Sequence, residues 1–350
     1  MNLNRIGRLG IGGLLILAGG LWVSAAPSGY HLIKKYSFGP ADGSKGEYFD
    51  YITVDSEARR VYLSRGTEID VINADSGELI GKITGLKRDH GVAVAKEFDK
   101  GFISDGEEGK VVVFDLKTLK VTGEVKAEKD ADCVAYDPFT KRVFVMEGDA
   151  ESATVIDARN DSVVKTIALG GGPEFAVADG KGTVYINLEN KNELLSVDAR
   201  TLEINSRWPV APAGGPTALA IDVEHHRLFT AGRKPQMLVV LDSENGKVIQ
   251  SFPISGGVDA DRFEPSTGRI FVSTREGKVH VFHEDTPNKY SEVETIETEV
   301  GAKTMGLDTK THNVFVDTAD FTPPPAPTAE RPHPRGGTVL GSFRVLVYGE

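Results

Sequence analysis

The sequence predicts an all-β protein, a seven-bladed β-propeller with four-stranded blades. Apolar segments recur with a period of about 42 residues, and each period holds four short runs rich in β-branched and aromatic residues. Gly, Asn, Asp and Pro bound these runs, and no long amphipathic helical pattern lies between them. Four strands in a unit of this length are typical of a propeller blade, which packs both its faces against neighbouring blades.

The first strand of each repeat is an apolar run that usually ends in an acidic turn. The first-strand segment of blade two ends in Ala95 instead, and that of blade six contains charged residues, as Asp261-Arg262-Phe263-Glu264. Seven such segments predict seven blades. They span residues 52–55, 92–95, 134–137, 176–179, 219–222, 261–264 and 305–308.

Two further landmarks follow in each repeat. The second is an apolar strand with a central aromatic residue, and the third commonly ends in an Asp whose carboxylate can accept backbone N–H groups of the next turn. A fourth strand follows, as at 163–167. The second landmark lies at 60–63, 100–103, 142–145, 183–186, 227–230, 269–272 and 313–316, and the third at 71–73, 113–115, 155–157, 196–198, 240–242 and 281–283.

The seventh blade is predicted to join the two ends of the chain. A proline-rich insert at 322–335 follows its second strand, and a further strand is expected at 343–348. The missing outer strand is supplied by residues 31–38, which leaves no open edge in the ring. Residues 26–350 are therefore expected to form a single domain. The insert is expected either to be disordered or to form a polyproline II segment that covers a channel mouth or binds a partner.

Residues 1–25 are expected to be a signal peptide. Arg5 and Arg8 provide positive charge, residues 10–23 form an apolar stretch shorter than the roughly 20 residues that span a bilayer, and small residues favour cleavage before Ala26. A periplasmic or extracellular location follows from this interpretation. The alternative is an uncleaved N-terminal anchor.

Charge and cysteine content exclude several classes of function. The 350 residues carry a net charge of −11, and no Lys- or Arg-rich run provides the basic surface that a phosphate backbone needs. Nucleic-acid binding is therefore not expected. Cys133 is the single cysteine, so disulfides within the chain, CxxC redox motifs and haem attachment are impossible. Its apolar neighbours favour a small buried side chain.

The repeat residues at 155–157, 171–177 and 184–187 resemble the YVTN repeat of YncE-like propellers. The resemblance covers residues 30–350, and it implies a secreted or periplasmic propeller, often of undefined activity. Family members have been linked to DNA binding and to surface display, but the acidic balance here argues against DNA. The chain does not resemble a WD40 array, because its tryptophans are Trp22 and Trp208 alone.

Seven residues are expected to form a ring at one mouth of the channel. Each stands five residues before the last residue of its first-strand segment, and equivalent positions of a propeller surround its axis. Nearby acids at 89, 130 and 261 are expected to make the opening more negative. The ring residues are Asp50, His90, Asp132, Glu174, Thr217, Asp259 and Lys303.

Two interpretations of the ring remain open: a solvated polar face without a ligand, or a binding site for a cation or polar ligand. Carboxylate oxygens favour hard cations such as Ca²⁺, and an imidazole favours a transition metal. Lys303 would oppose a cation; it could instead pair with Asp259 or Asp50, or bind a carboxylate of the ligand. The expected metal ligands are Asp132, Glu174, His90 and Asp259.

No GxSxG, HExxH or GxxxxGK[ST] motif is present. The sequence favours an exported, monomeric, noncatalytic propeller that binds a small molecule, a metal or a protein at an acidic channel mouth. The alternatives are a lactonase-type hydrolase or isomerase with His90 as base, and a periplasmic metal-binding protein. Any cofactor is unknown, a divalent cation being the candidate. His225 and His226, in a strand-connecting turn, are expected to face water.

Overall fold

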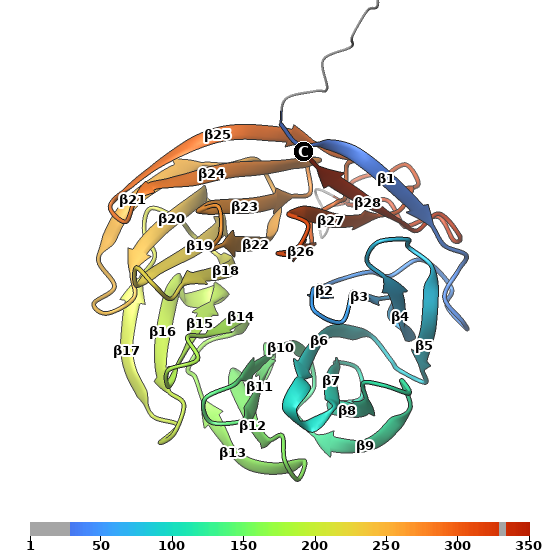
Figure 1. Cartoon of the computed structure of the whole chain (residues 1–350), viewed down its shortest axis with the longest axis horizontal. Helices are drawn as coiled ribbons and strands as arrows, with labels where there is room; N and C mark the ends of the chain where they lie inside the picture. Colours follow the sequence, from blue (N-terminus) through green and yellow to red (C-terminus); the bar gives the residue numbers. More distant parts are fainter. Residues whose placement is uncertain (1–28, 329–333) are drawn as a thin grey trace, which may run out of the picture.

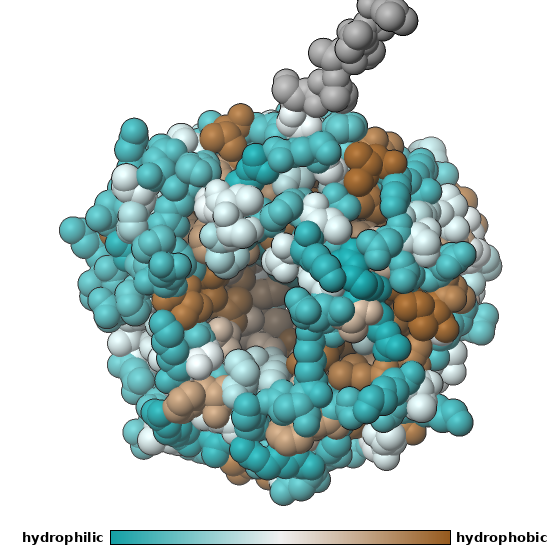
Figure 2. Space-filling model, viewed as in Figure 1, coloured by the Kyte–Doolittle hydropathy of each residue, from teal (hydrophilic) through white to brown (hydrophobic). Residues whose placement is uncertain are grey.

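The computed structural model describes residues 29–328 and 334–350. Seven four-stranded antiparallel sheets follow one another around a central axis, which confirms the predicted propeller (Figure 1). No α-helix occurs in these two ranges; the only helical elements there are two single 3-10 turns, η1 (Lys96–Phe98) and η2 (Glu189–Lys191). Figure 2 shows that the face in view is hollowed at its centre.

In blades 1 to 6 the strands follow the chain from the inside of the ring to the outside, and in blade 7 the outermost strand is β1. Blade 1 comprises β2 (Ile52–Asp55), β3 (Arg60–Ser64), β4 (Glu68–Asn73) and β5 (Leu79–Thr84); blade 2, β6 (Asp89–Ala95), β7 (Lys100–Asp105), β8 (Lys110–Asp115) and β9 (Val121–Lys126); blade 3, β10 (Ala131–Asp137), β11 (Arg142–Glu147), β12 (Ser152–Asp157) and β13 (Ser162–Ala168). Blade 4 comprises β14 (Pro173–Ala178), β15 (Thr183–Leu188), β16 (Glu193–Asp198) and β17 (Ile204–Pro209); blade 5, β18 (Pro216–Asp222), β19 (Arg227–Arg233), β20 (Gln236–Asp242) and β21 (Val248–Pro253). Blade 6 comprises β22 (Val258–Glu264), β23 (Arg269–Thr274), β24 (Lys278–Thr286) and β25 (Lys289–Glu297); blade 7, β26 (Met305–Asp308), β27 (Asn313–Thr318), β28 (Arg344–Gly349) and β1 (His31–Ser37).

The seventh blade joins both ends of the described chain. β1 pairs antiparallel with β28, from His31 opposite Gly349 to Ser37 opposite Arg344. Figure 1 shows the blue β1 directly beside the dark red β28. The closing strand thus forms where the sequence predicted it, and β28 begins and ends one residue later than expected.

The core lies between the blades, and the aromatic residue of each second strand is central to it. These side chains are at most 5% exposed, and each contacts the sheet of a neighbouring blade, as Tyr62 does with Phe114 at a ring-centroid distance of 6.0 Å. Burial of one such ring contributes about 2–3 kcal/mol. The seven residues are Tyr62, Phe102, Phe144, Tyr185, Phe229, Phe271 and Phe315.

The two ends of the proline-rich insert pair with each other where the insert leaves blade 7. The amide of Thr322 donates to the carbonyl of Gly337 at 2.8 Å, and Phe321 and Thr338 form a β-bridge. The Thr338 hydroxyl also donates to the carbonyl of Glu47 at 2.6 Å, which ties the insert to the segment that precedes β2. Residues 329–333 of the insert, and the predicted signal peptide at 1–25, lie outside the described residues.

Within residues 29–328 and 334–350, no helix has both the length and the apolar character needed to cross a membrane.

Candidate functional site

Six of the seven predicted ring residues line one cavity of about 330 Å³ at a mouth of the channel. All seven blades contribute to its wall, because every inner strand starts and every second strand ends at this end of the axis. Thr217 is the exception. Its hydroxyl is buried and donates to the carbonyl of Gly215 at 3.0 Å. The six are Asp50, His90, Asp132, Glu174, Asp259 and Lys303.

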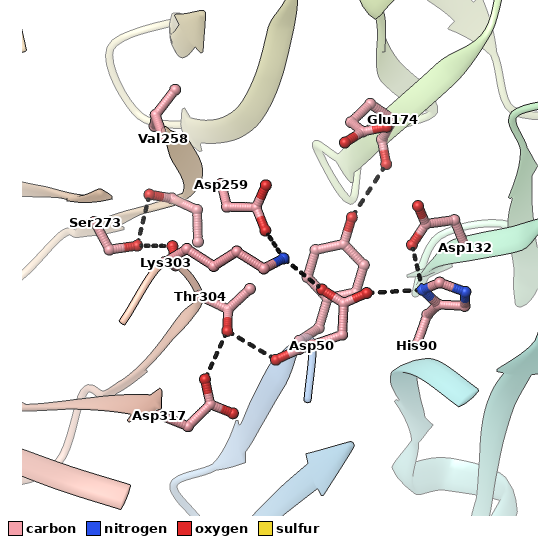
Figure 3. A network of polar contacts seen from close by, with 12 residues as sticks. Asp50, His90, Asp132, Glu174, Val258, Asp259, Ser273, Lys303, Thr304 and Asp317 are labelled. Atoms are coloured by element: carbon pink, nitrogen blue, oxygen red, sulfur yellow. Dashed lines mark hydrogen bonds and ion pairs between the residues drawn. The ribbon is translucent and has the colours of Figure 1, made fainter. Parts of the chain in front are cut away.

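His90 lies between two carboxylates on one side of the cavity (Figure 3). Its Nδ1 is 2.7 Å from Oδ2 of Asp50 and 3.2 Å from Oδ1 of Asp132, and the hydroxyl of Tyr48 is 3.0 Å from the same nitrogen. Burial acts to lower the pKa of His90, but the carboxylates of Asp132 and Asp50 outweigh burial and raise it. Burial raises the pKa of Asp132 to about 7, although His90 opposes this shift.

Lys303 provides a positive charge on the opposite side of Asp50. Its Nζ donates to Oδ1 of Asp50 at 3.1 Å and to Asp259. Burial acts to raise the pKa of Asp50, but Lys303 and His90 together lower it below its usual value. Lys303 is therefore a counterion of two carboxylates in the ring.

Three arginines of the cavity wall were missed by the sequence analysis: Arg88, Arg233 and Arg275. Arg233 pairs with Asp259, and its Nη2 lies 3.3 Å from Oε1 of Glu174. Arg233 ends the second strand of blade 5 and Arg275 directly follows the second strand of blade 6, where the repeat places a second ring of residues at the mouth. The 42-residue repeat could have located these positions. The second ring comprises Gly66, Gly106, Gly148, Glu189, Arg233, Arg275 and Ala319.

The opening therefore has mixed charge, whereas the sequence suggested an acidic one. Asp89 and Asp261 are fully buried and do not line the cavity. Asp130 lies 3.7 Å from Arg88, whose positive charge it partly balances.

Arg275 differs from the other cations of the wall. Its side chain is half-buried, and no acceptor within hydrogen-bond or ion-pair distance of its guanidinium occurs in residues 29–328 and 334–350. Burial lowers its pKa, and the neighbouring guanidinium of Arg335 lowers it further. An unpaired, partly desolvated guanidinium is a ready partner for an anionic group.

An aromatic layer lies next to the charged wall. The rings of Tyr51 and Phe175 meet edge to face at 5.4 Å, and the guanidinium of Arg262 lies 5.4 Å from the Phe175 ring centroid. Cys133 belongs to the same apolar cluster and is buried, as the sequence predicted. Burial raises the pKa of its thiol to about 12, so the reactive thiolate form is not populated near neutral pH.

Only part of the predicted metal-ligand set comes together. Ligand atoms of Asp50, His90 and Asp132 lie within 4.8 Å of one another, which suits an ion held by one imidazole nitrogen and two carboxylate oxygens. Glu174 and Asp259 instead pair with Arg233. The nearby ammonium of Lys303 opposes a cation at this position.

Replacement of Asp132 by Asn is expected to stabilise the protein more at pH 8 than at pH 4.5. A carboxyl group whose pKa is raised from 3.8 to about 7 on folding favours the folded state below its usual pKa, and this contribution is lost as the pH rises through about 7. The difference between variant and wild type should grow by about 2–4 kcal/mol over this range. Urea unfolding at both pH values measures it, and a difference independent of pH would contradict the assignment.

No family model matches the chain. An uncharacterized protein, YncE of Salmonella typhimurium, is 25% identical over 207 residues, which are 57% of this chain and 57% of YncE. The chain is YncE-like. YncE of Salmonella typhi is 24% identical over a region of the same length. The aligned region thus spans little more than half of these relatives, and it confirms the resemblance seen in the repeat residues.

Solved structures share the fold at low sequence identity. A chain of a mitotic checkpoint complex superposes with a TM-score of 0.73 at 10% identity, over 96% of this chain and 98% of its own. The WD40 repeats of RRP9 give a TM-score of 0.71 at 9% identity, over 89% of this chain and 99% of theirs. At such identities the likeness concerns the fold alone. Neither the propeller fold nor the similarity to YncE identifies a ligand.

Proposed function

We propose that this YncE-like chain is an exported, noncatalytic binding propeller that takes a small polar ligand with an anionic group at the channel mouth. The observation that carries the proposal is the guanidinium of Arg275, which lines the cavity without an acceptor among residues 29–328 and 334–350. The cavity of about 330 Å³ suits a small molecule.

The surroundings of Arg275 support an anionic group in particular. A second cavity of about 270 Å³ adjoins the first; both include Arg275 and Phe321, and the second is also lined by Arg335. The two neighbouring guanidiniums repel each other until an anion lies between them. A carboxylate or phosphate group would accept hydrogen bonds from both.

The opposite side of the cavity suits the polar remainder of the ligand. Burial raises the pKa values of Asp132 and Glu174, so these carboxyls can carry protons and donate hydrogen bonds. The tyrosines at positions 48 and 51 add hydroxyl groups to the wall. The ligand would thus contact side chains from several blades at once.

His90 is poorly placed to act as the general base of the hydrolase alternative. Nδ1 of His90 is held by Asp50 at 2.7 Å. Its Nε2 is packed against Gly106, so closely that a Cβ atom built on this glycine would lie only 2.8 Å from Nε2. Neither nitrogen is therefore free to take a proton from a substrate in the cavity.

A divalent cation is the second candidate ligand, because Asp50, His90 and Asp132 have the required spacing. A bound cation would replace the proton on Nδ1 of His90 and weaken the pairing between Lys303 and Asp50. Calorimetry with Ca²⁺ and Zn²⁺ on wild type and Asp132→Asn tests this candidate; identical traces would exclude it.

Replacement of Arg275 by Gln is expected to weaken binding of small anions by about 10- to 100-fold, the effect of losing a charge-assisted hydrogen bond. Succinate, citrate and inorganic phosphate are suitable probes, titrated calorimetrically at fixed ionic strength. Arg207→Gln is the matched control, because Arg207 lies on the outer strand β17 and pairs there with Glu193. Equal affinities in wild type and Arg275→Gln would contradict the proposal.

A further inference from the structure

We propose a divalent-metal site at the end of the propeller opposite the channel mouth, formed by Asp222, His225 and Glu284 between blades 5 and 6. Asp222 ends β18 and His225 belongs to the turn that follows, whereas the mouth lies at the start of the inner strands. The proposal is independent of the anion site at Arg275.

The first support is a departure from the repeat at His225. In three other blades this turn position is a threonine whose hydroxyl donates to the acid that ends the inner strand, at 2.5 Å from Asp137, 2.6 Å from Glu264 and 2.6 Å from Asp308. Blade 5 replaces this hydroxyl with an imidazole, and Nδ1 of His225 lies 2.7 Å from Oδ2 of Asp222.

The second support is a departure at Glu284 in the adjacent blade. Its amide donates to the carbonyl that precedes the second strand, as the amides of the equivalent residues in five other blades do. Those residues are uncharged, whereas blade 6 places a carboxyl there with only 5% of its side chain exposed. The equivalent residues are Ala74, Leu116, Ala158, Ala199 and Ser243.

The side chains of His225 and Glu284, which depart from the repeat, lie next to each other. Nδ1 of His225 lies 3.0 Å from Oε1 of Glu284 and 2.7 Å from Oδ2 of Asp222. The single N–H group at Nδ1 of His225 cannot donate to both carboxylates, and it donates to Asp222. Neither oxygen of Glu284 has a hydrogen-bond donor within residues 29–328 and 334–350. A buried carboxylate without a donor is costly, and a metal cation beside it would remove this cost.

The geometry suits a transition-metal ion. The three ligand atoms lie within 4.8 Å of one another, and one nitrogen with two carboxylate oxygens fits Zn²⁺ or Co²⁺. An adjoining cavity of about 180 Å³ leaves room for water as a further ligand. The His225 side chain is 42% exposed, so the sequence-based expectation of a water-facing imidazole holds for only part of the ring, and an ion can enter from solvent.

Titration of metal-stripped protein with Co²⁺ and Zn²⁺ tests the site, with calorimetry and the visible spectrum of bound Co²⁺ as readouts. Wild type is expected to bind one equivalent that is lost, or weakened at least 100-fold, in His225→Thr and in Glu284→Ala. Both variants install a residue that other blades carry at the same position. His283→Thr is the matched control, because His283 precedes Glu284 on β24, is 40% exposed and pairs with Asp285.

The melting temperature separates loss of binding from loss of folding. Zn²⁺ should raise it in wild type and in His283→Thr but not in the two site variants, and metal-free Glu284→Ala should melt no lower than metal-free wild type because it loses a buried unpaired carboxyl. A second equivalent bound at the mouth would persist in both site variants. Superimposable titrations of wild type and His225→Thr, or no binding by either, would overturn the proposal.

Discussion

Replacement of Lys303 by Met is expected to lower the free energy of unfolding by about 3–5 kcal/mol at pH 7. The ammonium pairs with Asp50 and Asp259, whose side chains are 11% and 6% exposed. Without it, the counterion left to Asp50 among residues 29–328 and 334–350 is His90, and the one left to Asp259 there is Arg233. Urea unfolding of the two proteins measures the loss.

The pH dependence identifies the cause of this loss. Carboxylates without a counterion acquire raised pKa values, so the variant should recover stability as the pH falls and both groups take up protons. Addition of Asp259→Asn to Lys303→Met should restore part of the lost stability, and Lys310→Met, at an exposed position, should cost little. A loss that is the same at pH 4.5 and pH 7 would contradict the role of Lys303 as counterion.

Replacement of Arg65 by Met is expected to destabilise the protein by a similar 3–5 kcal/mol. The guanidinium is 1% exposed, and it lies 2.9 Å from Glu47 and 2.7 Å from Asp70, both nearly fully buried. It also lies 4.0 Å from the ring centroid of Phe343. Its removal leaves two buried carboxylates and loosens the segment that leads from β1 into β2.

A charge-matched second change tests the Arg65 assignment. Glu47→Gln alone should cost less than Arg65→Met, and the double variant should be more stable than Arg65→Met, because one uncompensated charge is then removed. Denaturant unfolding of the three variants forms a double-mutant cycle. Strictly additive losses would show that Arg65 acts through packing rather than through this ion pair.

The fold could be predicted from the sequence because the same pattern of strands recurs seven times. The aromatic residue of each second strand, such as Phe144 or Phe315, recurs in phase and is buried as expected. Closure by residues 31–38 was predicted from the strand missing in the seventh repeat, and β1 forms at His31–Ser37. The path of the insert did not follow, because prolines favour an extended backbone without determining its direction.

The candidate site was only partly predictable. Counting from the inner strands placed Asp50 and His90 at the channel mouth, where both line the cavity, because one strand type with one period defines a ring. The same count placed Thr217 at the opening, although its hydroxyl bonds locally. Arg233 and Arg275 belong to a second ring at the ends of the second strands. Their effect on the charge of the mouth depends on how far their side chains reach, which spacing alone does not give.

A crystal structure of the protein purified from its own host, with any co-purified ligand, tests the central claim most directly. The account predicts a bound molecule on the propeller axis, with a carboxylate or phosphate oxygen within about 3 Å of the Arg275 guanidinium. A molecule bound on the axis with a cationic group against Asp132 and no contact to Arg275, or a ligand bound only elsewhere on the propeller, would contradict it.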